Sequence, residues 1–415
     1  MEEGVWRIVG GGVAGLAAAL AATRAGGRVA LYEASPQAGG RCRTVRGPDG
    51  FTHDNGTHVL IGANPRALAL LDEIGARARW IEPEPQGLPV YDARSRALHR
   101  VGLSPASWLA KNLRPPGLAF ADLPRFARLL APGRDRAIGE IFAGSGVLES
   151  FVEPLTLAVL NTPVAVASAR RLGRALRQVL APGGGRLYAA RNGLGPDLVE
   201  PAIATLIARG AQVETGARLR AIETAGGRMS ALLFARGGNE RVELGPHDRV
   251  ILALPPSEIG RFLPGIAAPT AFEPILNAHF ALAEPAPGAV RFIGLTGALS
   301  QWLIVRRDHV SVTVSAAAGE AMESDPDNLL VRIWSEIDPA LRAAGLELHR
   351  GERQRIVKEK RATIRQEAGL PVYAPRAPWP RLALAGDWIG PLPATIESAT
   401  ISGENAVRAL KRDAP

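Results

Sequence analysis

The apolar positions at the start of the chain fall into runs that a glycine-rich turn separates. The first run ends in Ile8 and Val9 and predicts a short buried strand. The second run, residues 13–22, is rich in alanine and predicts a helix that Arg24 ends. A third run at residues 28–32 predicts a second strand. Strand, turn, helix and strand in this order predict a βαβ unit.

Further apolar runs return much later in the chain. They predict strands at residues 211–215, 219–223, 249–254 and 381–387, and helical spacing follows at residues 395–410. We interpret these segments as parts of one α/β domain of the Rossmann-like kind. This discontinuous domain is predicted to comprise residues 1–79, 186–268 and 372–415.

The two intervening stretches, residues 80–185 and 269–371, predict a second domain of the α+β class. The first stretch is interrupted by prolines and is helical in character. The second stretch is predicted to contain strands at residues 301–305 and 310–315 and a helix at 327–337. A chain of 415 residues is long enough to form two separate cores.

Gly10, Gly12 and Gly15 have the G-x-G-x-x-G spacing of a dinucleotide-binding turn. Gly10 allows a tight turn, Gly12 lets a pyrophosphate approach the backbone, and Gly15 lets the helix pack closely on the sheet. The helix that begins near Val13 offers free N–H groups and a positive dipole end to phosphates. Glu33 follows about 20 residues later, where a carboxylate can accept hydrogen bonds from ribose hydroxyls.

The net charge and the cysteine content limit which partners and which kinds of site the protein can have. A net charge of +9 would favour anionic lipid or nucleic acid as a partner. The sequence contains no nucleic-acid-binding motif, so we expect no nucleic-acid partner. Cys42 is the only cysteine, which excludes an intrachain disulfide and a cysteine metal cluster, and we predict no metal site.

The sequence predicts a cytoplasmic protein. The first strand starts too close to the beginning of the sequence to leave room for a signal peptide. No run reaches the ~18 apolar residues that span a bilayer. Residues 104–130 mix apolar and basic side chains, which predicts either a peripheral contact with the inner face of the membrane or an amphipathic helix packed on its own domain. Trp108, Leu109 and Leu113 would supply the apolar part of that contact.

The motif Gly39-Gly40-Arg41 follows Glu33 closely, and Gly386-Asp387-Trp388 lies near the end of the chain. Together with the first glycine motif, these segments resemble the flavin amine oxidase and phytoene desaturase superfamily. The resemblance implies FAD as the cofactor, and a single glycine fingerprint leaves no separate site for NAD. It assigns FAD contacts to Gly10, Gly12, Val13, Ala14, Gly15, Glu33, Ala34, Gly39, Gly40, Arg41, Gly56, Thr57, Leu219, Gly386, Asp387 and Ile396.

A narrower resemblance rests on residues 54–64, 160–163 and 392–397. These segments are similar to the hydroxysqualene dehydroxylases of bacterial hopanoid biosynthesis. The resemblance implies that reduced FAD replaces an allylic hydroxyl of hydroxysqualene with hydride from flavin N5, giving squalene. The implied partners are an isoprenoid lipid substrate and an electron donor that the sequence does not identify. A long apolar tunnel would suit such a hydrocarbon.

Hydroxide is a poor leaving group, so the reaction needs an acid or hydrogen-bond donor at the departing oxygen. His58 is the leading candidate for this acid, because histidine titrates near neutral pH. The alternative is a structural histidine that only forms hydrogen bonds with the backbone. Asp54 and Asn55 are predicted to hold the turn and orient the ring or the substrate oxygen. Asn161 is a weaker candidate for a polar group at the tunnel end. Glu397 is a further candidate, with capping of the final helix as its alternative.

Three other functions fit part of this pattern. An isoprenoid or carotenoid desaturase would transfer hydride in the opposite direction. A flavin amine oxidase would be expected to place an aromatic pair over the flavin, but residues 391–394 contain no tyrosine. A flavin-binding partner of a terpenoid enzyme would show no turnover of its own.

Overall fold

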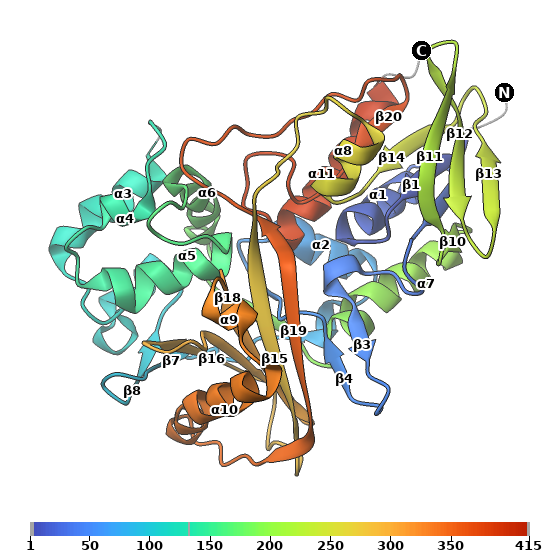
Figure 1. Ribbon diagram of the computed structural model, residues 1–415. Helices are drawn as coiled ribbons and strands as arrows, with labels where there is room; N and C mark the ends of the chain where they lie inside the picture. Colours follow the sequence, from blue (N-terminus) through green and yellow to red (C-terminus); the bar gives the residue numbers. More distant parts are fainter. Residues whose placement is uncertain (1–3, 132, 413–415) are drawn as a thin grey trace.

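The computed structural model describes residues 4–131 and 133–412. At its centre is a five-stranded sheet whose strands are all parallel (Figure 1). In spatial order the strands are β10 (Gln212–Glu214), β2 (Val29–Tyr32), β1 (Trp6–Val9), β14 (Arg249–Leu252) and β20 (Leu382–Leu384). Strands from three distant parts of the sequence therefore build one sheet, and the strands predicted at these places are confirmed.

Helices cover one face of this sheet. They are α1 (Val13–Arg24), α2 (Pro65–Glu73), α7 (Glu200–Ala208) and α11 (Ile396–Arg412). Helix α1 is buried from Val13 to Ala22, which explains why its sequence is apolar on all sides. It packs closely against α11, because a Cβ at Gly403 would stand 2.2 Å from the carbonyl oxygen of Ala14. Glycine at that position permits the close contact between the two helices.

The opposite face of the sheet packs against a three-stranded antiparallel sheet and a short helix. These elements are β11 (Arg218–Ala225), β12 (Arg228–Ala235), β13 (Asn239–Glu243) and α8 (Pro256–Phe262). Tyr32 of β2 stacks on Phe234 of β12 with ring centroids 4.4 Å apart. The parallel sheet is thus buried on both faces, as its apolar strands require.

A second, seven-stranded sheet contains one parallel pair, β16 with β7, among antiparallel ones. Long strands β15 and β19 run side by side through the middle of Figure 1. Helix α10 (Pro326–Ala343) covers one face, and Asp325 caps its N-terminus. In spatial order the strands are β19 (Arg350–Ile364), β15 (Phe272–Leu282), β18 (His309–Ser315), β17 (Trp302–Val305), β16 (Arg291–Thr296), β7 (Leu88–Asp92) and β8 (Ala97–Val101).

Helices of the middle segment form a separate apolar cluster beside this sheet, on the left of Figure 1. They are α3 (Leu123–Leu130), α4 (Ile138–Ile141), α5 (Glu153–Leu160) and α6 (Ala169–Val179). The expectation that residues 80–185 are helical in character is incomplete, because β7 and β8 also lie there. β7 and β8 pair with each other as a hairpin, but their place in the larger sheet depends on β16, about 200 residues later, which a local pattern does not reveal.

Two small sheets frame the loop at residues 55–58. One pairs β3 (Thr44–Arg46) with β4 (Thr52–Asp54); the other joins β5 (Val59–Ile61), β9 (Leu187–Ala190) and β6 (Trp80–Ile81). The loop is therefore held by a strand on each side. Helix α9 (Glu320–Glu323) precedes α10. Within the described residues, no helix has both the length and the apolar character that crossing a membrane requires.

Candidate active site

The first glycine motif forms an open cradle at the start of α1. Gly10 has a φ of +107°, and a Cβ there would stand 2.2 Å from the carbonyl oxygen of Ala253. A Cβ at Gly15 would stand 1.8 Å from the carbonyl oxygen of Gly10, so helix and turn are in close contact. Apart from neighbouring backbone, a Cβ at Gly12 would meet no atom of the described residues within 4 Å. Gly12 therefore borders free space that a bulky group can enter.

The second glycine motif closes the cradle from the other side. Gly39 and Gly40 have φ values of +112° and +54°, which favour glycine. The N–H of Gly39 donates to the carbonyl oxygen of Gly11 at 2.8 Å. A Cβ on Gly40 would stand 3.3 Å from the Cα of Gly12, so the two motifs form one wall.

Glu33 stands at the end of β2 beside the cradle. Its carboxylate accepts hydrogen bonds from the backbone N–H of Gly11 at 2.7 Å and of Ser35 at 2.8 Å. These two bonds hold the carboxylate in place. A carboxylate has about four acceptor sites, so capacity for a ribose hydroxyl remains.

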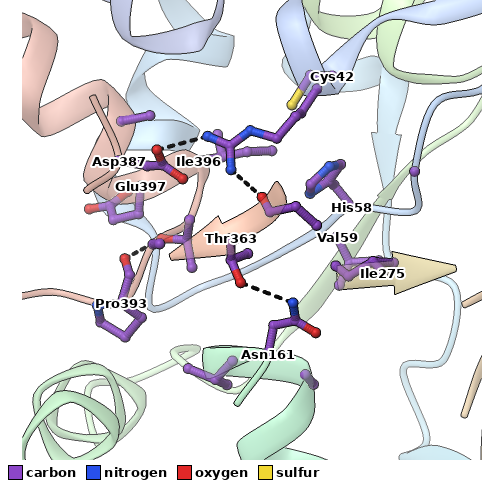
Figure 2. Close-up of a pocket in the computed structure, with 18 of the residues that line it drawn as sticks. Cys42, His58, Val59, Asn161, Ile275, Thr363, Asp387, Pro393, Ile396 and Glu397 are labelled. Atoms are coloured by element: carbon purple, nitrogen blue, oxygen red, sulfur yellow. Dashed lines mark hydrogen bonds and ion pairs between the residues drawn. The ribbon is translucent and has the colours of Figure 1, made fainter. Parts of the chain in front are cut away.

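Arg41 joins three distant segments next to the glycines. Its Nη2 lies 2.7 Å from Oδ1 of Asp387, and its Nη1 donates to the carbonyl oxygen of Ala362 (Figure 2). The charge of Asp387 raises the pKa of Arg41, so the guanidinium stays charged. The arrangement places a cation beside the cradle, where it can compensate phosphate charge.

The N-terminus of α11 forms the far wall. Ile396 begins the helix, and its N–H has no hydrogen-bond partner among the residues described. Glu397 does not make the capping hydrogen bond to its own helix that was one of its two predicted roles. Its two carboxylate oxygens accept from the N–H groups of Arg66 at 3.1 Å and Ala67 at 2.8 Å, at the start of α2. Glu397 therefore links two helices.

One cavity of about 1030 Å³ runs along these groups. All the residues predicted as site residues line it, except Gly15 and Asp54. From the cradle the cavity continues into an apolar chamber between the second sheet and the middle helices. The side chains that form the chamber include Leu88, Val90, Trp108, Phe126, Leu155, Leu176, Phe292 and Trp302.

His58 faces the cavity between these two parts (Figure 2). Burial, assisted by the nearby Arg41, lowers the pKa of His58 to about 4. The ring is therefore neutral near pH 7 and can donate a hydrogen bond from N–H. The expectation of a histidine that titrates near neutral pH does not hold for this environment, because desolvation disfavours the charged ring.

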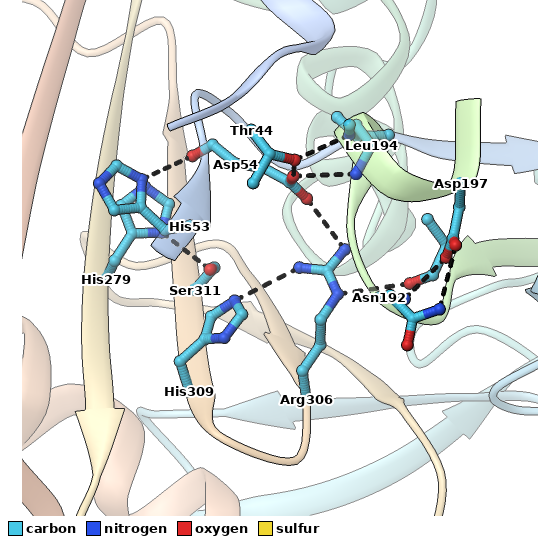
Figure 3. A network of polar contacts seen from close by, with 12 residues as sticks. Thr44, His53, Asp54, Asn192, Leu194, Asp197, His279, Arg306, His309 and Ser311 are labelled. Carbon is cyan, nitrogen blue, oxygen red and sulfur yellow. Dashed lines mark hydrogen bonds and ion pairs between the residues drawn. The ribbon is translucent and has the colours of Figure 1, made fainter. Parts of the chain in front are cut away.

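Asp54 is buried behind the loop and does not reach the cavity. Its Oδ1 accepts from Oγ1 of Thr44 at 2.6 Å and from the N–H of Leu194 at 2.9 Å, and its Oδ2 lies 3.1 Å from Nη2 of Arg306 (Figure 3). These contacts anchor the loop from behind, and Asp54 does not line the cavity. Asn55 lines the cavity, and its N–H donates to the carbonyl oxygen of Arg43 at 2.9 Å.

Asn161 borders the cavity, but its amide is used within the protein. Nδ2 donates to the carbonyl oxygen of Glu273 at 3.2 Å and to Oγ1 of Thr363 at 2.9 Å (Figure 2). Oδ1 accepts from the N–H of Ala316 at 2.6 Å. These bonds tie the end of α5 to β15 and β19, so the side chain holds the wall together.

Two polar groups at the cavity were missed by the sequence reasoning. Asn277 and Thr313 face the cavity from neighbouring strands, and Oγ1 of Thr313 donates to Oδ1 of Asn277 at 2.8 Å. The available signal was a lone asparagine in an apolar stretch, 275–282. That signal does not reveal a partner on another strand.

Cys42 and Trp108 behave as packing residues. Burial raises the pKa of the Cys42 thiol to about 12, so the thiolate does not form near neutral pH. Trp108 packs against Phe126 and Phe151, and it donates to the carbonyl oxygen of Gly102. It is therefore not available for an external contact. No metal-binding cluster of His, Cys, Asp or Glu occurs in the described part of the chain.

The cavity has the features that FAD requires. Free space borders Gly12 at the N-terminus of α1, where phosphates bind favourably. Arg41 supplies a positive charge, and the N–H of Ile396 has no hydrogen-bond partner within the described part of the chain. Oγ1 of Thr57 is buried and has no partner among residues 4–131 and 133–412, although buried hydroxyls are normally hydrogen-bonded. A bound dinucleotide would supply partners for these groups.

The parallel sheet, the glycine cradle and the adjoining apolar chamber define a flavin-dependent oxidoreductase. The chain belongs to the family of flavin-containing amine oxidoreductases, whose sequence pattern matches residues 13–411. FAD is accordingly its cofactor.

Two relatives extend over nearly the whole chain. A hydroxysqualene dehydroxylase from Rhodopseudomonas palustris is 38% identical over 413 residues, covering 96% of this chain and 96% of the relative. A hydroxysqualene dehydroxylase from Zymomonas mobilis is 34% identical, covering 97% and 98%. The fold is similar to that of an oxidoreductase from Methanosarcina mazei, with a TM-score of 0.73, 13% identity and coverage of 97% and 100%.

Proposed function

We propose that this protein reduces hydroxysqualene to squalene with electrons from reduced FAD. The observation that carries the proposal is the single cavity that joins the glycine cradle to an apolar chamber. The cradle suits the cofactor, and the chamber suits a long hydrocarbon with few polar groups. The similarity to two hydroxysqualene dehydroxylases over almost the full chain supports the same assignment.

The reaction exchanges a C–O bond for a C–H bond. The oxygen leaves with the electron pair of the C–O bond and takes up one proton, so that water is formed. When held in its reduced form at the cradle of Gly12 and Arg41, FAD would supply the hydride for the new C–H bond and would be oxidised in doing so. An external reductant must then restore it. The chain's own part is to hold the hydroxyl, orient the allylic carbon and keep water away with apolar walls such as Phe292 and Trp302.

The direct test uses purified protein loaded with FAD and reduced anaerobically by dithionite. Hydroxysqualene is added, and the apolar products are identified by mass spectrometry. We expect squalene, in an amount that rises with protein and is absent without FAD. A parallel assay offers phytoene or squalene to the oxidised protein; desaturated products there, with none from hydroxysqualene, would identify a desaturase and overturn the proposal.

We further propose that the mouth of the chamber rests on a lipid surface. Leu123 and Leu180 line the cavity and are exposed to solvent, so they stand at its opening. Leu109 and Phe120 lie in the neighbouring segment and are 87% and 82% exposed. Lys111 is exposed in the same segment. Exposed apolar side chains with a basic neighbour favour an anionic membrane, which is also where an isoprenoid substrate would dissolve.

Flotation with vesicles that contain anionic phospholipid tests this surface. We expect wild-type protein to float with the vesicles, and the double variant Leu109→Ser, Phe120→Ser to remain in the soluble fraction. Ile207→Ser on α7 is the matched control, because Ile207 is also an exposed apolar residue but lies away from the opening. Equal flotation of the double variant and wild type would contradict this surface.

A further inference from the structure

Strand β15 carries a buried asparagine whose amide is aimed at the cavity. Asn277 is 2% exposed and lies between Leu276 and Ala278. Because its Oδ1 accepts from Thr313, its Nδ2 is turned toward the cavity that the residue lines. Within residues 4–131 and 133–412, Nδ2 has no hydrogen-bond partner. Nδ2 is not fully enclosed by the protein, so it is open to the cavity and can donate there to a ligand or to water.

The space beside Nδ2 lies over Gly56. A Cβ on Gly56 would stand 3.4 Å from Nδ2 of Asn277 and 3.8 Å from Nε2 of His58. Apart from the chain neighbours of Gly56, no other described atom lies within 4 Å of that point. Because Gly56 has no side chain, a small hollow remains above it, with Nδ2 of Asn277 on one side and Nε2 of His58 on the other.

Apolar side chains form most of the surrounding chamber. Ile275 precedes Asn277 on the cavity-facing side of β15, and Phe272 and Leu295 also line the cavity. The hollow over Gly56 is therefore a local polar spot in a surface that otherwise suits hydrocarbon. Such a spot fixes the position of a single polar group on an apolar ligand.

We propose that this hollow binds the hydroxyl group of the substrate, with Asn277 and His58 as the two donors to its oxygen. Thr313 is a positioning residue, because it acts by holding the amide of Asn277. The inference rests on the proposed function, since it specifies where that same site would hold the leaving oxygen. The Thr313–Asn277 pair lies on two paired strands, so the donor is held by the sheet rather than by a loop.

The arrangement would assist departure of the hydroxyl. Negative charge builds on the oxygen as the C–O bond breaks, and fixed donors stabilise that charge more than they stabilise the intact alcohol. The same donors would also favour binding of the substrate over binding of the product. Squalene carries no hydroxyl, so it leaves Nδ2 of Asn277 without a partner, and a buried unpaired donor opposes its binding.

The test compares variants of the FAD-loaded protein in two independent measurements. The first is kcat/KM for hydroxysqualene under reducing conditions. The second is the ratio of affinities for hydroxysqualene and squalene, measured from the perturbation of the oxidised flavin spectrum. Asn277→Leu removes the amide donor but keeps a side chain of similar size. Thr313→Val removes the hydroxyl that donates to Oδ1 of Asn277, and Thr313→Ser keeps a hydroxyl at that position. Ser311→Ala is the control, because Ser311 lies on the same strand but bonds His279.

We expect Asn277→Leu to lower kcat/KM by roughly 100-fold and to reduce the preference for hydroxysqualene by about 10-fold. Its affinity for squalene should stay unchanged or rise. Thr313→Val should show a smaller loss of the same kind, which Thr313→Ser reverses, and Ser311→Ala should keep the wild-type preference. An equal loss of affinity for both ligands, or a wild-type preference in Asn277→Leu, would overturn the inference. Failure of the wild type to form squalene would instead overturn the proposed function.

Discussion

Arg41 and Asp387 form an ion pair of 2.7 Å that connects opposite ends of the sequence at the cofactor cradle. Arg41 follows the second glycine motif, and Asp387 follows the last strand of the parallel sheet. The same guanidinium also donates to the carbonyl oxygen of Ala362 on β19. The cradle is therefore complete only after both ends of the chain and β19 have come together.

This arrangement predicts that Arg41→Met weakens FAD binding. A hydrogen bond to a charged group contributes about 1.5–3 kcal/mol, so affinity should fall by roughly 10- to 100-fold. Titration of the FAD-free protein with FAD, followed by flavin fluorescence, measures the loss. Arg94→Met is the control, since Arg94 pairs with Glu149 on the surface. Equal FAD affinity in Arg41→Met and wild type would remove Arg41 from the cofactor site.

Substitution by alanine should have different effects at two glycines of the first motif, Gly12 and Gly15. Gly12→Ala places a methyl group in free space, so the protein should fold normally but bind FAD poorly. Gly15→Ala places a methyl group 1.8 Å from the carbonyl oxygen of Gly10, and the required backbone shift should cost about 1–3 kcal/mol or more. Denaturant unfolding and flavin absorbance separate the two effects. A yellow, FAD-saturated Gly12→Ala protein would show that phosphates do not occupy this space.

Glu397 is predicted to stabilise the fold rather than to react. It accepts from two N–H groups at the start of α2, and loss of a helix cap costs about 0.5–2 kcal/mol. Glu397→Ala should lower the free energy of unfolding by about that amount, while kcat at a permissive temperature stays near wild type. Urea unfolding and turnover assays together test this. A folded, FAD-loaded variant without turnover would place Glu397 in the chemistry instead.

His58 should make the protein less stable in acid. Burial lowers its pKa from 6.5 to about 4, so between these values the unfolded chain binds a proton that the folded protein does not. Stability therefore falls as the pH drops from 6.5 toward 4, by up to about 3 kcal/mol. His58→Asn should reduce this slope but not abolish it, because burial also lowers the pKa of His53 and of His279.

The free energy of unfolding in urea is measured for wild type and His58→Asn at several pH values between 7 and 4.5. The control is His247→Asn, since His247 is exposed and does not line the cavity. A slope in His58→Asn as steep as that of wild type would show that His58 does not remain neutral in the folded protein. The same low pKa predicts that turnover does not depend on an imidazolium at position 58 near pH 7.

Local patterns predicted the cradle well. The strand, the glycine turn, the helix and the carboxylate of Glu33 lie within about 30 residues of one another. Glycines mark the turn, and apolar runs mark the strand and the helix. Sheet strands from later parts of the chain were also found, because buried parallel strands are short apolar runs. Strand β19 was not predicted, because residues Arg350–Ile364 include many charged side chains and most of these positions are only half-buried.

Side-chain partners were harder to predict than backbone elements. The buried Arg306 contacts Asp54 from a turn between β17 and β18, and nothing in the sequence near Asp54 reveals it. Asn161 and Glu397 were predicted near the site, and both lie at it, but their polar atoms are used by distant backbone groups. The division into two domains and the roles of the site residues remain predictions.

Hydride from the reduced cofactor is predicted to replace the hydroxyl of the substrate. Reduction of the FAD-loaded protein in deuterium oxide places deuterium at the exchangeable, transferable position of the flavin. A single turnover with hydroxysqualene should then give squalene that carries one deuterium, in an amount equal to the flavin oxidised. Squalene without deuterium, or reduced flavin that hydroxysqualene fails to oxidise, would contradict the account.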